Sequence, residues 1–174
     1  MMTTKPHQDS YAIVGELVLI SSTLDYLLTQ VLIDVLDLGR SPMLKSVIMT
    51  LDPARKIEIL KERAKKIAPP HWKKELTSFV NKAERVFKYR NIACHTQPIF
   101  DKGTWTLQPF AAAKVLKSID KTHSIEGVSF DVLKTAISTA EAALASGVNL
   151  CDNIKRAKAE RAKRDRGPLA VFAN

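Results

Sequence analysis

Residues 51–70 read LDPARKIEILKERAKKIAPP and show where one helix begins, which face it buries and where it ends. Asp52 is a residue type preferred at the N-cap position, and Pro53 suits the first helical position because its missing N–H is not needed there. Two prolines, Pro69 and Pro70, end the helix. Apolar residues recur between these limits at spacings of three and four: Ile57, Leu60, Ala64 and Ile67. The stretch therefore predicts an amphipathic helix that is bounded at both ends.

The segments on either side of this helix carry the same helical pattern. Before it we expect a long helix from about Asp9 to Leu38 and a short one over Met43–Thr50. The long helix is apolar on more than one side, which is typical of a helix at the centre of a bundle or one covered by another subunit. After it we expect a helix from His71 to about His95, which Pro98 prevents from continuing. A last helix begins near Ser129, a residue type suited to the N-cap position.

The segment between the last two helices has a different pattern. Residues 98–110, PIFDKGTWTLQPF, place an Asp-Lys-Gly turn between short strand-like runs, which predicts a β-hairpin. Glycine is sparse, at 6 of 174 residues, and this disfavours a sandwich or barrel with many tight turns. We therefore expect an all-α protein, an antiparallel bundle of about four to six helices in one domain of residues 1–174. A flexible tail over 1–8, a hairpin and loop insertion over 98–128 and a basic helix end and tail over 155–174 complete the expected layout.

The charge balance favours a polyanionic partner. The formal net charge is +9 and the sequence pI is near 9.6, which is typical of proteins that bind RNA or DNA. The run KRAKAERAKRDRG, residues 155–167, holds seven basic and two acidic residues. It is either a well-solvated helix end or a basic arm that contacts nucleic acid, and lysine-rich helices that are simply solvated remain the alternative explanation of the net charge.

The two cysteines, Cys94 and Cys151, fall at apolar helical positions. We expect reduced core thiols rather than a disulfide, which fits a reducing cytoplasm. Cys94 and His95 form an isolated pair without a second cluster of ligands, so zinc is not expected. The polar N-terminus MMTTKPHQDS lacks the layout of a signal peptide, and acidic residues interrupt the apolar run that follows. The sequence therefore predicts a cytoplasmic protein with no membrane contact.

One stretch, KYRNIACHT over residues 88–96, places charged groups where an apolar face should continue. Arg90 follows Phe87 by three positions and Val86 by four, so it projects from the same face of the helix as these apolar residues. A buried arginine needs a partner because an unpaired charge in a core is costly. Arg90 is therefore expected either in a polar cleft or in an ion pair with a first-helix carboxylate: Glu16, Asp25 or Asp34.

His95 follows Arg90 by five positions, which is about 140° around the axis of a straight helix. The two side chains converge only if the chain unwinds near His95, or if a second subunit places its own pair opposite. Asn91 lies four positions before His95, where its amide can orient the imidazole. The candidate site is therefore Arg90, Asn91 and His95, without a cofactor or a metal ion.

This stretch resembles the motif of the HEPN superfamily (higher eukaryotes and prokaryotes nucleotide-binding). Members are small helical bundles that carry an arginine, then a polar residue, and then a histidine after four to six intervening residues. Arg90 matches the arginine, Asn91 the polar position and His95 the histidine, with four residues between Arg90 and His95. The order of helices is also similar, with a long first helix, a motif at the end of a later helix and a long closing helix. Members commonly place a small residue such as glycine after the histidine, and Thr96 departs from that pattern.

The resemblance implies a metal-independent endoribonuclease that works as a homodimer, with two motifs facing each other across one composite cleft. It also implies a role as the toxin of a toxin–antitoxin or defence pair, with an antitoxin or nucleotidyltransferase-like protein as partner. In this chemistry His95 exchanges protons while the ribose 2′-hydroxyl attacks the adjacent phosphorus. Arg90 offers a fork of donors to the phosphate, and Asn91 holds His95 or a phosphate oxygen.

Two other functions stay open at this point. One is a helical dimer of the same fold that binds a nucleotide, an RNA or a partner protein without turnover. The other is a structural role, in which Arg90 pairs with a carboxylate of the first helix and His95 caps its own helix.

Overall fold

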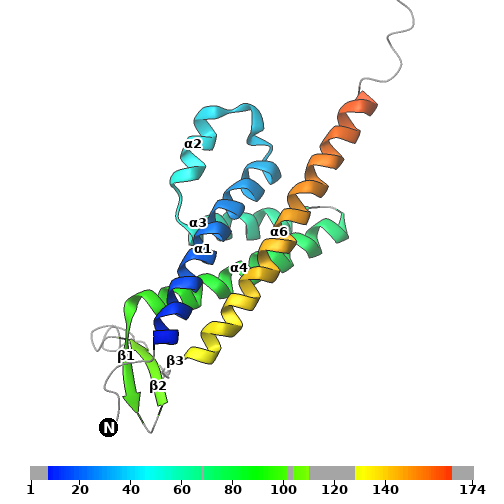
Figure 1. The fold of residues 1–174 in the computed structure, drawn as a ribbon. Helices are drawn as coiled ribbons and strands as arrows, with labels where there is room; N and C mark the ends of the chain where they lie inside the picture. Colours follow the sequence, from blue (N-terminus) through cyan, green and yellow to red (C-terminus); the bar gives the residue numbers. More distant parts are fainter. Residues whose placement is uncertain (1–7, 68, 102–103, 110–127, 166–174) are drawn as a thin grey trace, which may run out of the picture. The chain divides into compact units, whose positions relative to one another are not determined.

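The computed structural model describes residues 8–67, 69–101, 104–109 and 128–165. These residues form an all-α helical bundle with one small antiparallel sheet, which confirms the predicted fold class (Figure 1). The helices are α1 (Gln8–Val35), the 3-10 turn η1 (Leu38–Arg40), α2 (Pro42–Thr50), α3 (Pro53–Lys65), α4 (Pro70–His95) and α6 (Phe130–Asp165). The strands are β1 (Thr96–Asp101), β2 (Thr104–Pro109) and β3 (Val128–Ser129).

Contacts divide the chain into two compact units. The first unit comprises Met1–Asp25 and Asn81–Ala143, and the second comprises Tyr26–Val80 and Leu144–Asn174. The long helices α1, α4 and α6 therefore each contribute one part to the first unit and the other part to the second. A single domain over the whole chain stays a prediction.

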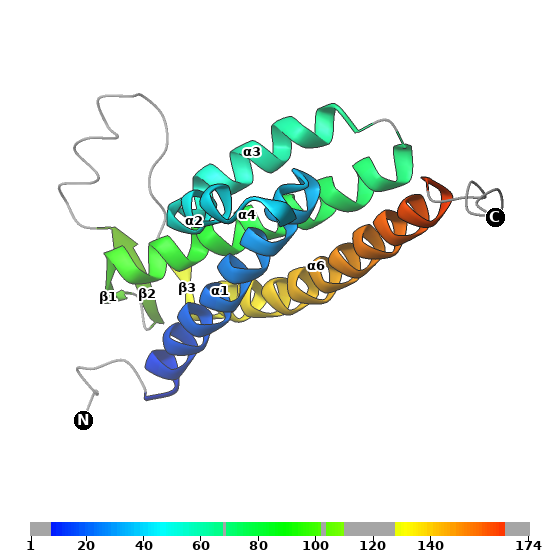
Figure 2. The ribbon, with the colours of Figure 1, turned by 90° about the horizontal axis from the view of Figure 1, so that it is seen from above.

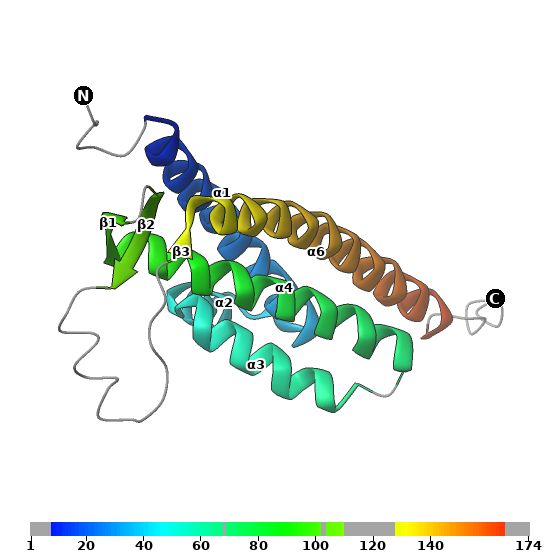
Figure 3. The same ribbon diagram turned by 90° about the horizontal axis from the view of Figure 1, so that it is seen from below.

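In the second unit, α3 begins where the sequence predicted, but it ends at Lys65, so Ile67 of the predicted apolar face lies beyond the helix. The carboxylate of Asp52 accepts a hydrogen bond from the backbone N–H of Arg55 at 2.8 Å, which satisfies one of the free donors at the helix start. Figures 2 and 3 show α3 and the first half of α4 running side by side in opposite directions. The predicted face is buried at Ile57, Leu60 and Ala64. Lys56 is also buried, with 1 % of its surface exposed, which the apolar pattern does not predict.

In the first unit, the predicted hairpin follows α4 without a break. Thr96 pairs with Pro109 and Asp101 with Thr104 in an antiparallel register, and β3 adds to the other edge of β2. Phe100 and Trp105 face each other across the pair, with ring centroids 5.3 Å apart. The strand order β1-β2-β3 leaves β1 at an edge of this sheet, the position that tolerates Pro98. The predicted turn residues 102–103 and most of the predicted insertion, 110–127, lie outside the described residues.

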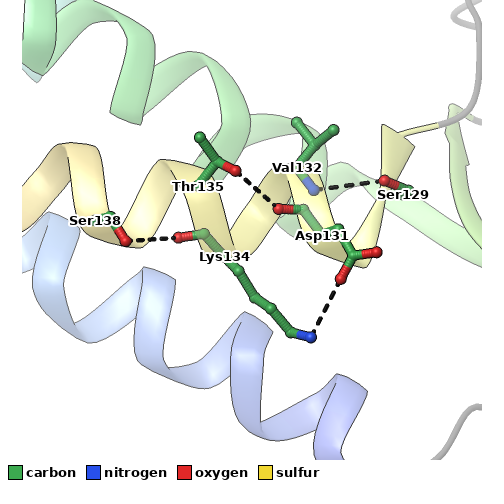
Figure 4. Close-up of polar contacts among 6 residues, drawn as sticks. All are labelled: Ser129, Asp131, Val132, Lys134, Thr135 and Ser138. Atoms are coloured by element: carbon green, nitrogen blue, oxygen red, sulfur yellow. Dashed lines mark hydrogen bonds and ion pairs between the residues drawn. The ribbon is translucent and has the colours of Figure 1, made fainter.

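The start of α6 confirms the N-cap predicted at Ser129. The hydroxyl oxygen of Ser129 accepts a hydrogen bond of 3.4 Å from the backbone N–H of Val132 (Figure 4). Asp131 lies in the first turn, where its negative charge interacts favourably with the positive end of the helix dipole. Its Oδ1 also lies 3.1 Å from the Nζ of Lys134. The hydroxyl of Thr135 donates to the carbonyl oxygen of Asp131 at 3.1 Å, inside the same turn. Local chemistry therefore fixes where the closing helix begins.

The first helix is more apolar than its burial requires. By length and composition alone, residues Ser10–Val35 could cross a membrane, but the core helices of soluble proteins pass the same test. In the apolar window of this helix, 33 % is buried inside the protein. In the first unit, Tyr11 and Leu19 of α1 are 57 % and 72 % exposed. These two positions lie eight residues apart, which is about 80° around the axis of a helix. The predicted excess of apolar surface on this helix is therefore present as exposed side chains.

Candidate functional site

The three predicted site residues occupy the last turns of α4, all within the first unit. The buried side chains of Ala83, Val86 and Phe87 anchor the preceding turns of this helix, and the buried Ala93 anchors its last turn. A helix held on one face in this way presents the rest of its last turns on a rigid support. The site is thus built on regular structure and not on a loop.

Arg90 is half-buried, and its side chain is held by its neighbour. The guanidinium Nη1 donates a hydrogen bond of 3.1 Å to Oδ1 of Asn91, and Asn91 itself is exposed. The position follows from the sequence, because Arg90 continues the apolar face of Val86 and Phe87 at the point where that face reaches water. A guanidinium has five N–H groups, and among the described residues Arg90 uses one of them for Asn91, so the others can donate to an anion.

His95 is the last residue of α4 and is exposed. Because α4 stays helical through His95, its side chain and that of Arg90 diverge by about 140° around the helix axis. The unwinding that would bring the two together within one chain does not occur. The predicted hydrogen bond from Asn91 to His95 is absent too, and within the described parts of the chain the imidazole has no hydrogen-bonding partner.

Thr96 closes the helix immediately after His95. Its hydroxyl donates a hydrogen bond of 2.6 Å to the backbone carbonyl oxygen of Ile92, one of the acceptors left free at a helix end. The next residues enter β1, so the backbone on both sides of His95 is in regular structure. The residue that departs from the HEPN-like pattern therefore has a clear structural role here.

The two cysteines differ from the prediction in one respect. Both are free thiols, but Cys94 is exposed, so it is not the core thiol that the apolar pattern predicted. Ala93 beside it is buried, so the covered face of the last turn of α4 ends between these two residues. Cys151 is buried as predicted, and burial, followed by the negative charge of Asp34, raises its pKa to about 11.

We expect iodoacetamide at pH 8 to modify Cys94 and to leave Cys151 unmodified in the folded protein. The thiolate is the reactive form, and a pKa raised from 9.0 to about 11 leaves Cys151 about a hundredfold less thiolate at this pH, in addition to its burial. Peptide mass spectrometry after timed labelling gives both rates. Labelling in urea is the control, because there both residues should react. Equal rates in the folded protein would contradict the burial of Cys151.

Sequence reasoning missed a second feature, which we call the basic groove. It lies in the second unit, has a volume of about 1080 Å³ and is lined by the end of α1, η1, the end of α3, the start of α4 and the last turns of α6. Its charged lining consists of Arg40, Arg63, Lys158, Arg161, Asp34 and Asp37. The one sign of this groove in the sequence was the basic run after residue 154, because the rest of its lining comes from segments that are distant in the chain.

Neither a metal site nor a similarity to known proteins assigns a function to this chain. Among the residues that the structure describes, no three His, Cys, Asp or Glu side chains gather in a way that could hold a metal ion. No protein-family model matches the chain, and no curated protein or solved structure shows significant similarity to it.

Proposed function

We propose that this protein is an endoribonuclease that cleaves RNA without a metal ion, with Arg90, Asn91 and His95 as its reacting groups. The observation that carries the proposal is the end of α4, where an exposed imidazole follows a half-buried guanidinium by five positions. Among the described residues the imidazole has no hydrogen-bonding partner, and the guanidinium uses one of its donors for Asn91. A surface histidine and a partly buried arginine are common individually. Together they offer proton transfer and phosphate binding on one rigid helix end, in a strongly basic protein.

The reaction uses groups that the RNA itself supplies. His95 accepts the proton of a ribose 2′-hydroxyl, whose oxygen forms a bond to the adjacent phosphorus. The bond between that phosphorus and the 5′-oxygen breaks, and a protonated imidazole returns a proton to the leaving oxygen. Arg90 donates to the non-bridging phosphate oxygens, where negative charge grows in the transition state. Asn91 keeps the guanidinium in place through the bond at 3.1 Å.

A second copy of the chain completes this site. On one uninterrupted helix, His95 and Arg90 point about 140° apart, so one phosphate contacts both most simply when each comes from a different copy. The exposed apolar side chains Tyr11 and Leu19 of α1, in the same unit, support such an association, because large exposed apolar groups favour protein contacts. In this proposal the protein is a homodimer, and an antitoxin would act by covering the same helix ends.

Incubation of the purified protein with RNA in excess chelator is expected to give fragments with 2′,3′-cyclic phosphate and 5′-hydroxyl ends. The same RNA with 2′-O-methyl riboses should stay intact, because the attacking hydroxyl is blocked. Electrophoresis and mass spectrometry of the ends give the readout, and light scattering at micromolar concentration gives the mass in solution. RNA of many sequences that stays intact would contradict the ribonuclease and favour the alternative, a module that binds without turnover. A strict monomer would contradict the composite site.

A further inference from the structure

The basic groove combines an apolar floor with a charged rim. Its floor is formed by side chains that are buried or half-buried, among them Trp72, Leu76 and Leu150. The volume of about 1080 Å³ lies just above the range of about 300–1,000 Å³ for small-molecule sites, so the groove has room for a larger ligand.

The charges of the rim are unbalanced in favour of cations. Arg40, Arg63, Lys158 and Arg161 face two carboxylates, Asp34 and Asp37, so the lining carries a net charge of 4 − 2 = +2. Asp37 is already engaged, since the Nζ of Lys158 lies 2.7 Å from its Oδ1. That bond, the charge of Lys158 and the more distant charges of Arg40 and Arg161 hold the pKa of the Asp37 carboxyl below its usual value. The lining therefore carries more positive than negative charge, which favours an anionic ligand.

The shape of the groove comes from small residues on α6. Ile154, Lys158 and Arg161 line it from successive turns of this helix, and beside the two basic residues in the sequence the lining is alanine: Ala157, Ala159 and Ala162. Alanine removes bulk where a larger side chain would fill the space, so the basic groups stand at the edges and leave the centre open. On the opposite side Trp72 is only half-buried, and its ring lies 5.4 Å from that of His71 at the start of α4.

We propose that the basic groove binds a segment of single-stranded RNA, with a base stacked on Trp72 and phosphates held by Arg40, Arg63 and Arg161. Single-strand binding sites combine aromatic platforms with a basic channel, because each base has a flat face and each linkage a negative charge. The carboxylates of an acidic peptide would satisfy the cations, but they offer no flat ring for the indole. The proposal goes beyond cleavage, because the groove would hold a strand whether or not the end of α4 cuts it.

Fluorescence anisotropy with a labelled 2′-O-methyl oligouridine of about 12 nucleotides tests this binding. This probe cannot be cleaved through a 2′-hydroxyl, so the measurement is independent of the proposed ribonuclease activity. Arg63→Gln is expected to weaken binding about 3- to 10-fold and to reduce its dependence on salt. The matched control is Arg55→Gln, which removes the same charge from the same helix. Arg55 does not line the groove and pairs with Glu58, so this variant should bind within about twofold of the unmodified protein.

Two further variants separate stacking from simple charge attraction. Trp72→Leu is expected to weaken binding about 5- to 100-fold, the range found when a stacking aromatic is removed. Asp37→Asn should tighten binding about two- to fivefold, because it removes a negative charge from the rim. Asparagine also tolerates the left-handed backbone of this residue, whose φ is 56°. A merely structural role for Asp37 would not produce tighter binding.

Three results would overturn the proposal: equal weakening by Arg63→Gln and Arg55→Gln, no loss with Trp72→Leu, or displacement of the probe by polyglutamate as effective as by unlabelled oligouridine. The last result would identify the groove as a general site for acidic proteins. Circular dichroism melting of each variant shows whether it folds, and the exposed Arg55 and Arg63 keep the test valid if Trp72→Leu does not fold. Intact RNA in the cleavage assay, together with RNA binding that depends on the groove residues, would contradict the proposed ribonuclease activity. It would leave the binding proposal unchanged.

Discussion

Replacement of His95 by alanine is expected to lower kcat/KM for RNA cleavage at least about 10²-fold, and up to about 10⁴-fold, while the thermal stability stays nearly constant. The loss follows from removal of the group that moves the proton. The stability stays because His95 is exposed and has no hydrogen-bonding partner among the described residues. Substitutions at such surface positions usually change the free energy of unfolding by less than about 0.5 kcal/mol. Initial cleavage rates and a melting curve measure both quantities.

The matched control for this variant is Cys94→Ala, the exposed neighbour on the same turn of α4. It truncates an adjacent side chain to the same methyl group and should leave cleavage unchanged. Arg90→Ala should also abolish cleavage, with a larger cost in stability because Arg90 is half-buried and bonded to Asn91. Full activity of His95→Ala would exclude the imidazole from the reaction. A drop in melting temperature as large as the drop in rate would identify a structural histidine instead.

Replacement of Gly147 by valine is expected to destabilise the protein by about 3 kcal/mol, the upper end of the usual cost of an overpacked core. In the second unit, a Cβ added at Gly147 would lie 2.5 Å from Cδ2 of Leu27 and 2.6 Å from Cε2 of Phe79. Leu27 is 8 % exposed and Phe79 is 0 % exposed, so neither can move out into water. The midpoint of thermal unfolding should fall by about 6–12 °C for a chain of this size.

Gly15→Val provides the control for this steric effect. Gly15 also lies inside a long helix, α1, but nothing stands within 4 Å of a Cβ added there, and the position is exposed. Valine has a slightly higher helix propensity than glycine, so this variant should be neutral or slightly more stable. Urea unfolding of both variants gives the difference between the two free energies. Equal stability of the two variants would show that α1, α4 and α6 do not pack closely at Gly147.

The helix ends were predictable from sequence because their causes are local. Asp52 and Ser129 accept the hydrogen bonds expected of N-cap residues, and α4 ends at His95 as the proline three residues later requires. A helix needs no distant partner to begin or end at such residues. The hairpin was predictable for the same reason, since its two strands are neighbours in the chain.

Features that depend on distant residues were not predictable. The apolar pattern of α3 does not show that Lys56 is buried, because its burial depends on what packs against that face in three dimensions. Periodicity placed Cys94 in the core, but it cannot tell where neighbouring elements stop covering a helix. The bond between Arg90 and Asn91 depends on side-chain rotamers, and the basic groove on five separate segments. The sequence predicted the three motif residues of the candidate site, but it predicted neither their side-chain contacts nor the groove.

Pro98 in the outermost strand β1 also limits how copies of this protein can join. A strand at the border of a sheet is a template on which an extended segment of another chain can be added, and this is a common route to fibres. Proline has no N–H, so an incoming strand would find one donor missing along this border. Addition of strands at this border is therefore disfavoured, so copies that associate through the exposed side chains of α1 are not also drawn into a sheet that grows from β1.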